Sequence, residues 1–225
     1  MYPFIKRFFD ILFSAIALVV LSPLLLPVII LLKCTGEHEV FYFQKRVGFR
    51  NREFNIWKFA TMKKDSPNIG TGEITLRNDP RVTTMGKFLR KTKINELPQI
   101  INVLLGDMSI VGPRPLMKKS FDLYTPEVQA VIYNSRPGIT GIGSVIFRDE
   151  EKIVSESTDL QATYRDIFQY KGMVEMWYQR HFSFYTDFMI IFLTAWHVIF
   201  SGSRLVYKIF PTLPASTLQP MPARV

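Results

Sequence analysis

Cysteine and histidine are scarce in this sequence of 225 residues, which contains one cysteine, Cys34, and three histidines. A single cysteine cannot form an internal disulfide, and there is no second thiolate to complete a metal site of the zinc-finger kind. His38, His181 and His197 lie far apart in the sequence and form no local ligand pair, so we expect structural roles for them. A reducing, cytoplasmic environment is the simplest interpretation.

Acidic residues are in the minority. Lysine and arginine number 28 against 19 aspartates and glutamates, which gives a formal net charge of +9. This excess predicts an acidic partner: nucleic acid, anionic lipid or a phosphorylated substrate. Nucleic acid is disfavoured because the basic residues adjoin apolar segments rather than aromatic stacking platforms. The hydrophobic content of 48% indicates one globular unit with additional parts embedded in a membrane.

Charged residues are absent between Ile11 and Leu32. These residues form an apolar segment of about 22 residues, which is long enough to cross a bilayer. No small-residue cleavage site follows it, so a secretory signal is not expected. Basic residues flank both ends, and the positive-inside rule therefore favours a cytoplasmic position for both. These flanking residues are Lys6, Arg7, Lys33, Lys45 and Arg46.

Two prolines interrupt the apolar segment. Pro23 has no N–H to bond the carbonyl of Val19, and the Ser22 hydroxyl can bond the carbonyl of Leu18 and help to bend the helix. A break at Ser22-Pro23 permits either a kinked transmembrane helix or a hairpin that re-enters the side it left. Because lipid-exposed carbonyls are costly, the second form should lie shallow or against protein.

Two short segments after the apolar run predict a β hairpin. Residues 40–44 and 53–58 have the composition of strands, and a cation-rich turn separates them. Residues 65–79 are polar and lack an apolar period, which indicates a loop. A helix capped near Thr83 or Thr84 should follow.

A further helix is predicted from Glu96 to Leu105. Asn95 is a favourable N-cap residue, Pro98 is tolerated in a first turn, and Gly106 is suited to end the helix. The free amides and the positive dipole at the start of this helix would stabilise a charged Glu96 and attract anions.

Three motifs stand close together: Asn95-Glu96-Leu97-Pro98, Gly106-Asp107-Met108-Ser109 and Gly112-Pro113-Arg114-Pro115. The whole stretch from Leu89 to Pro115 strongly resembles the signature of the bacterial sugar transferases. These small monotopic phosphoglycosyl transferases move a sugar phosphate from a nucleotide sugar to polyprenyl phosphate. The family pattern begins with an Asp-Glu pair, so Asn95 stands at the position of the family's nucleophile.

The resemblance covers most of residues 4–205. Lys6-Arg7-Phe8-Phe9-Asp10 and Leu21-Ser22-Pro23 look like the family's re-entrant membrane helix, and Pro137-Gly138-Ile139-Thr140-Gly141 matches a further family segment. The family pattern has an arginine where this chain has Ala60, and the missing cation is expected to alter phosphate or lipid contacts. Glu175 aligns with a position that is usually aspartate.

Phosphoryl transfer between two polyanions requires neutralised charge and alignment. Glu96 is the candidate ligand for Mg²⁺, because magnesium prefers carboxylate oxygen and no thiolate or imidazole set competes; a purely helix-stabilising role is the alternative. Asp107 and Glu175 are candidate supporting residues, although Gly106-Asp107 could form only a turn. The candidate phosphate-binding residues, each of which could instead be merely solvated, are Arg90, Arg114, Arg136, Arg148, Lys58, Arg81 and Lys87.

The carboxamide of Asn95 is a very poor nucleophile, so the chemistry requires another route. Polyprenyl phosphate could attack a metal-bound nucleotide sugar directly. Another carboxylate, Glu96 or a member of Asp149-Glu150-Glu151, could replace the family nucleophile, although a solvated charge run is the simpler interpretation of the latter. Alternatively, the chain is a catalytically degenerate member that binds lipid phosphate or partner enzymes.

These features predict a mainly helical α+β fold in a monotopic membrane protein with a re-entrant helix kinked at Ser22-Pro23, a small β hairpin and interfacial amphipathic helices. The expected division is a membrane helix at residues 1–36, a catalytic domain at 37–205 and a proline-rich tail at 206–225, loosely ordered from Pro211. Residues 182–200 should lie in the membrane interface rather than form a second span.

The predicted function is that of a phosphoglycosyl transferase at the cytoplasmic face of a bacterial inner membrane, which releases nucleoside monophosphate in the first membrane step of glycoconjugate or exopolysaccharide synthesis. The expected cofactor is Mg²⁺. The expected partners are a nucleotide sugar, polyprenyl (undecaprenyl) phosphate and inner-membrane lipid, with a homo-oligomer or downstream glycosyltransferases as further candidates and no nucleic acid.

Overall fold

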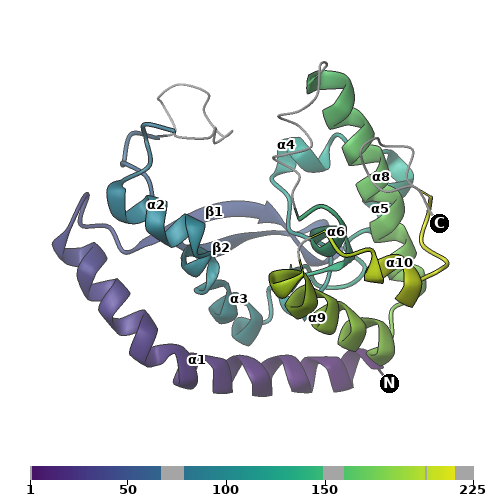
Figure 1. The fold of residues 1–225 in the computed structure, drawn as a ribbon, viewed down its shortest axis with the longest axis horizontal. Coiled ribbons are helices and arrows are strands. Elements are labelled where there is room, and N and C mark those ends of the chain that lie inside the picture. Colours follow the sequence, from purple (N-terminus) through teal and green to yellow (C-terminus); the bar gives the residue numbers. More distant parts are fainter. Residues whose placement is uncertain (1, 67–78, 149–159, 201, 216–225) are drawn as a thin grey trace. The chain divides into compact units, whose positions relative to one another are not determined.

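The computed structural model describes residues 2–66, 79–148, 160–200 and 202–215 of the chain. Helices dominate these residues and are accompanied by two small two-stranded sheets, which confirms the prediction of a mainly helical α+β fold (Figure 1). Most of the loop predicted at residues 65–79 and the acidic run Asp149-Glu150-Glu151 lie outside the described residues.

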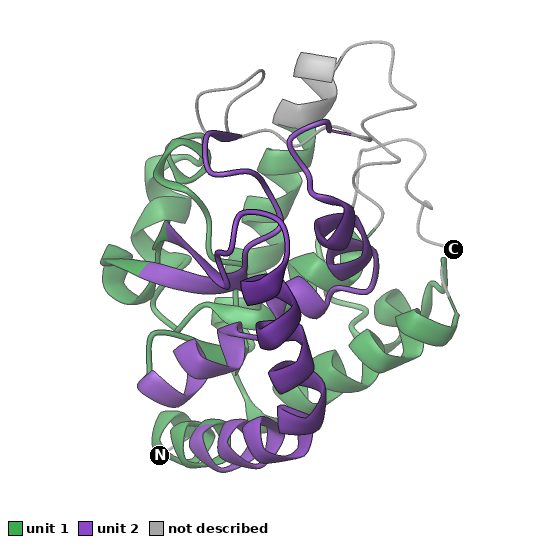
Figure 2. Cartoon of the chain, turned by 90° about the vertical axis from the view of Figure 1, so that its left-hand side faces the viewer, with its two compact units in different colours: residues 1–10, 45–54, 106–225 green, residues 11–44, 55–105 purple. Residues whose placement is uncertain are grey.

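The chain forms two compact units (Figure 2). Unit 1 comprises residues 1–10, 45–54 and 106–225, and unit 2 comprises residues 11–44 and 55–105. The chain passes from one unit to the other within the first helix and within the β hairpin. The expected division into residues 1–36, 37–205 and 206–225 stays a prediction.

Helix α1 runs from Tyr2 to Cys34 and extends beyond the predicted apolar segment at both ends. Its 33 residues correspond to about 50 Å, and a window within it has a mean hydropathy of 2.9, so it is long and apolar enough to cross a membrane. Pro23 and Pro27 lie inside this helix, which bends along its length (Figure 1). Prolines are a common cause of such bends.

The hydroxyl of Ser22 donates to the carbonyl of Val19 at 2.7 Å, and not to the predicted acceptor, Leu18. The physical reason is that Pro23 leaves the carbonyl of Val19 without its helical N–H donor. Ser22 therefore supplies the hydrogen bond that Pro23 removes.

The predicted β hairpin is confirmed, with longer strands than expected. Strand β1, Phe41–Val47, pairs with β2, Glu53–Phe59, and the short 3₁₀ helix η1, Phe49–Asn51, lies between them. Within unit 2, Phe41 stacks on Phe59 with ring centroids 5.6 Å apart. The buried members of the adjoining apolar cluster are Val28, Leu32, Phe59 and Leu89.

Helix α2, Thr84–Lys91, begins as predicted. The hydroxyl of Thr83 accepts a hydrogen bond from the backbone N–H of Gly86 at 2.9 Å, which makes Thr83 the N-cap residue. A Cβ atom at Gly86 would lie 2.1 Å from the carbonyl oxygen of Thr61. The helix can therefore pack directly against the segment that follows β2 only because position 86 is glycine.

The predicted helix start at Asn95 is wrong. Residues Ile94–Glu96 form a 3₁₀ helix, η3, and the α-helix α3 extends only from Gln99 to Leu105. Pro98 has no N–H for the carbonyl of Ile94, which accepts instead from the N–H of Leu97 at 3.1 Å and tightens the turn. Asn95 is thus not an N-cap, and Glu96 does not lie in the first turn of an α-helix. Gly106, with φ of 101°, ends α3 as expected.

Unit 1 contains the second sheet and the remaining helices. Strand β3, Ser109–Val111, pairs in parallel with β4, Gly138–Thr140, so that Ser109 lies opposite Gly138 and Val111 opposite Thr140. The described helices of this unit are α4 Lys118–Phe121, α5 Pro126–Val131, α6 Ile142–Ile146, α8 Leu160–Arg180, α9 Phe184–Ile199 and α10 Leu205–Ile209.

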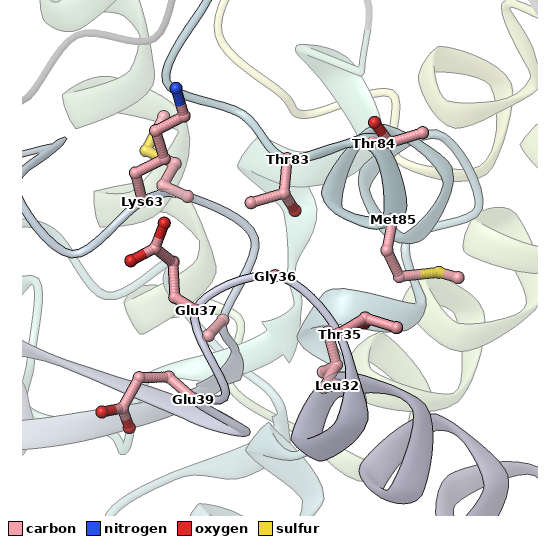
Figure 3. A pocket seen from close by; sticks show the side chains of 11 residues that line it. Leu32, Thr35, Gly36, Glu37, Glu39, Lys63, Thr83, Thr84 and Met85 are labelled. Atoms are coloured by element: carbon pink, nitrogen blue, oxygen red, sulfur yellow. The ribbon is translucent and has the colours of Figure 1, made fainter.

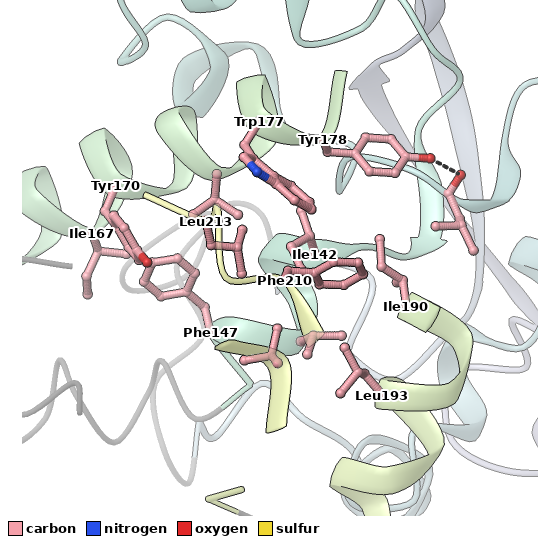
Figure 4. Packing of buried hydrophobic residues seen from close by; sticks show 14 residues of the cluster. Ile142, Phe147, Ile167, Tyr170, Trp177, Tyr178, Ile190, Leu193, Phe210 and Leu213 are labelled. Carbon is pink, nitrogen blue, oxygen red and sulfur yellow. Dashed lines mark hydrogen bonds between the residues drawn. The ribbon is translucent and has the colours of Figure 1, made fainter. Parts of the chain in front are cut away.

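Buried side chains of α6, α8, α9 and α10 form the main core of unit 1 (Figure 4). The hydroxyl of Tyr178 on α8 donates to the carbonyl of Val111 on β3 at 3.4 Å, which links this core to the second sheet. Phe210 and Leu213 are buried in the same core. The loose order predicted from Pro211 therefore does not begin there. The Trp177 indole of α8 donates to the hydroxyl of Thr212 at 3.0 Å, and the Tyr170 hydroxyl of α8 donates to the carbonyl of Pro214 at 2.9 Å.

Helix α9 has one buried and one exposed face. The buried face includes Ile190, Leu193 and Asp187, whose carboxylate accepts hydrogen bonds from the Tyr178 hydroxyl at 2.7 Å and from the Lys6 ammonium. The exposed apolar residues are Phe184, Tyr185, Phe188, Ile191, Phe192, Val198 and Ile199. Among the described helices only α1 is both long and apolar enough to cross a membrane, and α9 has 16 residues.

Candidate active site

The residues predicted to form the site fall into both units. Unit 2 carries Lys58, Arg81, Lys87, Arg90, Asn95 and Glu96. Unit 1 carries Asp107, Arg114, Arg136, Arg148 and Glu175.

Lys58 and Glu96, both in the unit 2 set, form an ion pair. The ammonium nitrogen of Lys58 lies 3.1 Å from Oε1 of Glu96. The two side chains are 17% and 26% exposed, so the pair is partly shielded from water yet open to it. Lys58 reaches this position from the end of β2, and Glu96 from η3.

Asn102, which sequence reasoning overlooked, fixes α3 to β2. Its carboxamide oxygen accepts from the backbone N–H of Trp57 at 2.9 Å, and its carboxamide nitrogen donates to the carbonyl of Asn55 at 2.8 Å. The side chain of Asn102 thereby continues the hydrogen-bond pattern of a strand edge. The available signal in the sequence was a polar residue within the otherwise apolar residues 100–105, and the structure shows that this residue is fully buried.

Asn95 is 9% exposed, and its carboxamide oxygen has no hydrogen-bond partner among the described residues. A buried acceptor without a donor is unfavourable and indicates that a donor or a cation completes the site. The oxygens of Asn95 and Glu96 are the hard donors that Mg²⁺ accepts, and magnesium often takes one or two protein ligands, with water and phosphate completing its shell. In the described ranges no group of three or more His, Cys, Asp or Glu residues is arranged to hold a metal alone.

Arg90 and Lys87 lie on α2. The Nε of Arg90 donates to the hydroxyl of Thr61 at 2.9 Å, and the side chain is partly exposed. Lys87 is exposed. Arg90 is thus oriented by a neighbouring hydroxyl, whereas Lys87 is a surface cation.

Arg81 is almost fully buried against Asp79. Its Nη2 lies 2.6 Å from Oδ2 of Asp79, and its Nη1 donates to the carbonyl of Ser66 at 3.0 Å. The Arg81 side chain is 3% exposed. These contacts support a structural role for Arg81 in its loop more directly than phosphate binding.

A pocket of about 480 Å³ lies in unit 2, between the C-terminal end of α1, the segment after β2 and the start of α2. Figure 3 shows Glu37 and Lys63 on one side of it and Leu32, Thr35 and Met85 on the other. Ala60 also lines the pocket. This is the position where the family resemblance implies an arginine, so the small side chain leaves the recess without that cation.

In unit 1, the corner Pro113-Arg114-Pro115 exposes its arginine and buries both prolines. The hydroxyl of Tyr133 donates to the carbonyl of Arg114 and accepts from the N–H of Leu116, each at 2.9 Å. Burial raises the pKa of Tyr133, so the hydroxyl stays protonated and keeps both bonds. Tyr133 was not predicted, because it is distant in sequence from the corner that it holds.

The glycines near this corner permit close packing. A Cβ atom at Gly112 would lie 2.2 Å from the carbonyl oxygen of Arg136, and one at Gly141 would lie 2.1 Å from the carbonyl oxygen of Gly112. Gly138 is equally crowded, since its Cβ would lie 2.1 Å from the nitrogen of Gly112. The contact between β3 and β4 therefore explains these glycines without a phosphate.

Arg136 is held at the start of β4. Its Nε donates to the carbonyl of Gly106 at 2.7 Å, and its guanidinium lies over the ring of Phe49, 5.1 Å from the centroid. Asp107 is partly exposed in the turn that follows α3. Arg148 is exposed just beyond α6.

Glu175 on α8 is a buried carboxyl group beside Gly143. It accepts a hydrogen bond from the backbone N–H of Gly143, and its Oε2 has no partner among the described residues. Burial raises the pKa of Glu175 to about 7, although Lys171 and the N–H of Gly143 oppose the shift. The carboxyl group of Glu175 is therefore a buried group of unit 1 with a pKa near neutral pH.

These features define a membrane-associated protein with a long apolar N-terminal helix and a polar site in a small α+β fold. The sequence model of the family described as bacterial sugar transferase matches residues 1–201. The chain belongs to this family.

Three curated relatives illustrate the similarity. The chain is 37% identical over 195 residues to a UDP-N-acetylgalactosamine-undecaprenyl-phosphate N-acetylgalactosaminephosphotransferase from Aeromonas hydrophila, covering 86% of this chain and 43% of the relative. It is 35% identical over 206 residues to an undecaprenyl-phosphate glucose phosphotransferase from Komagataeibacter xylinus, covering 87% of this chain and 36% of the relative. It is 33% identical over 204 residues to the exopolysaccharide production protein ExoY of Rhizobium meliloti, covering 84% of this chain and 83% of the relative. The chain thus spans about two fifths of the length of the first two relatives.

Proposed function

We propose that this chain transfers a sugar phosphate from a nucleotide diphosphate sugar to polyprenyl phosphate, with release of nucleoside monophosphate, in the first membrane step of glycoconjugate or polysaccharide synthesis. Membership of the bacterial sugar transferase family and the activities for which the Aeromonas hydrophila and Komagataeibacter xylinus relatives are named support this function. The observation that carries it in this structure is the partly exposed Lys58–Glu96 pair, together with the unpartnered carboxamide oxygen of the preceding residue, Asn95.

The chemistry follows from the charges in unit 2. Both substrates are polyanions, so the protein must supply cations and alignment rather than a covalent partner. Lys58 contacts Glu96 at 3.1 Å, and Arg90 lies on α2 of the same unit. Glu96 with Asn95 would hold Mg²⁺. When bound, Mg²⁺ neutralises phosphate charge and fixes phosphate oxygens in place.

A direct transfer fits a carboxamide at position 95. A phosphate oxygen of polyprenyl phosphate attacks the phosphorus that carries the sugar and forms the new P–O bond. The bond from that phosphorus to the bridging oxygen breaks, and nucleoside monophosphate leaves with the bonding electron pair. Asn95 does not become bonded to the sugar phosphate, because a neutral carboxamide is a poor nucleophile.

The membrane arrangement is part of the proposal. Helix α1 would enter the inner membrane from the cytoplasmic face and return to it at the bend near Pro23 and Pro27, with bound Mg²⁺ and nucleotide sugar on the cytoplasmic side. The exposed apolar residues of α1, the basic residues at both of its ends and the exposed aromatic face of α9 support a monotopic, interfacial arrangement.

The test uses the full chain in detergent micelles with a panel of nucleotide sugars. We expect release of nucleoside monophosphate with at least one donor, and only when polyprenyl phosphate and Mg²⁺ are both present. Absence of release with every donor, while polyprenyl phosphate still binds, would favour the second candidate: a catalytically degenerate family member that binds lipid phosphate. The carboxamide of Asn95 is the observation that favours this second candidate.

A further inference from the structure

We propose that Lys58 is an exchangeable counter-ion of Glu96. In the free protein its ammonium group neutralises the Glu96 carboxylate; when a divalent cation binds Glu96, the ammonium moves to the diphosphate of the donor. This inference rests on the proposed function for the identity of the diphosphate, and on the oxygens of Asn95 and Glu96 for the cation.

Two ion pairs in unit 2 show why Lys58 can exchange. Arg81 holds Asp79 through several hydrogen bonds, and both side chains are nearly inaccessible, at 3% and 4% exposure. Lys58 and Glu96 have a 3.1 Å contact and are 17% and 26% exposed. A lysine ammonium on a flexible stem can leave such a site, whereas a guanidinium fork in a closed site cannot do so readily.

The charges make the exchange necessary. A single carboxylate cannot favourably hold an ammonium ion and a divalent cation within a few ångströms, because the two cations repel strongly in a partly shielded site. A donor diphosphate supplies negative charge, so the ammonium group of Lys58 can bind the diphosphate while the divalent cation binds Glu96. Binding of the cation and binding of the diphosphate should therefore strengthen each other, and the coupling must be reciprocal.

The backbone next to Lys58 need not move during this exchange. Asn102 holds the N–H of Trp57, and the Trp57 ring packs against the rings of Phe41 and Phe43 with centroids 5.3 and 4.8 Å apart. Rotation of the Lys58 side chain alone can transfer its charge. Lys58 is thus a residue that would couple metal binding to donor binding.

The experiment measures the dissociation constant of Mn²⁺, used as a probe for Mg²⁺, with the full chain in detergent micelles and without nucleotide. For Lys58→Gln and Lys58→Met, we expect binding about tenfold tighter than in the parent, equivalent to ~1.4 kcal/mol. Glu96→Gln should weaken binding at least about tenfold. The control Lys91→Gln removes an exposed cation from the last turn of α2 and should leave the constant within about twofold.

Two results would overturn the proposal. One is unchanged or weaker Mn²⁺ binding in both folded Lys58 variants, with folding checked by thermal melting. The other is unchanged binding in Glu96→Gln, which would remove Glu96 from the cation site. Neither result depends on turnover, so absence of nucleoside monophosphate release would contradict the proposed function while leaving the measured exchange intact.

Discussion

The segments at residues 94–105 in unit 2 and 109–115 in unit 1 are close in sequence but differ in how their polar groups are satisfied. The first contains an unpartnered carboxamide oxygen on Asn95 and a partly exposed carboxylate on Glu96. The second is closed at its backbone: Gly112 packs against the carbonyl of Arg136, and the Tyr133 hydroxyl bonds the carbonyl of Arg114 and the N–H of Leu116. Its one similarity to the first is the buried hydroxyl of Ser109, which has no hydrogen-bond partner among the described residues. The first segment has the properties of a binding site, and the second holds an exposed arginine rigidly.

The largest expected effect comes from Glu96→Gln, which removes a negative charge from the segment at residues 94–105. We expect a loss of about 10³-fold in the rate of nucleoside monophosphate release, typical of removing one electrostatic group from an active site. A coupled assay for the released nucleotide measures it. Glu53→Gln, which affects an exposed pair with Lys45 at 3.8 Å, is the matched control and should keep the parental rate. Full activity in Glu96→Gln would remove this residue from the site.

Gly112→Ala tests the close backbone packing of the segment at residues 109–115. The new Cβ would lie 2.2 Å from the carbonyl oxygen of Arg136, so β3 and β4 must separate. We expect a loss of about 3 kcal/mol in the free energy of unfolding, at the upper end of the overpacking range, measured by denaturant titration. Ile139→Ala, which trims an exposed side chain on β4, is the milder comparison. Parental stability in Gly112→Ala would show that the two strands do not pack this closely.

Glu175 should make the stability of unit 1 depend on pH. Its pKa is raised by burial to about 7 in the folded chain from an ordinary value of 4.5, so the folded state binds more protons than the unfolded state between these values. The free energy of unfolding should therefore fall as pH rises from about 4.5 to about 7, by about 3 kcal/mol at most.

Denaturant titrations across this pH range, compared with Glu175→Gln, measure the effect. The variant retains a hydrogen-bond acceptor for Gly143 but cannot ionise, so its curve should lack this fall. Identical pH dependence in the parent and the variant would contradict the assignment.

A smaller effect is expected for Asn102→Ala. This change leaves the N–H of Trp57 and the carbonyl of Asn55 without their side-chain partner, at a cost of about 2 kcal/mol in the free energy of unfolding. Asn55→Ala retains the carbonyl and should change stability by less than about 0.5 kcal/mol. If the two variants are equally stable, Asn102 does not fix α3 to β2.

The same comparison shows what sequence could reveal. The hairpin and the Thr83 cap were predicted correctly, because both depend on residues that are neighbours in the chain. The start of α3 was misplaced because the missing N–H of Pro98 outweighed the capping preference of Asn95. Asn102, Tyr133 and the packed glycines could not be assigned from sequence alone, since their partners lie on distant segments. The roles of Arg114, Arg136 and Arg148 in phosphate binding stay predictions.

The most direct test of the account is a single-turnover measurement with the full chain and an active nucleotide sugar, with and without polyprenyl phosphate. Direct transfer without a covalent intermediate on Asn95 predicts one equivalent of nucleoside monophosphate per enzyme when the acceptor is present and none when it is absent. The mass of the intact protein should be unchanged in both cases. A burst of nucleoside monophosphate without acceptor, accompanied by a protein heavier by one sugar phosphate, would contradict it and identify a covalent nucleophile.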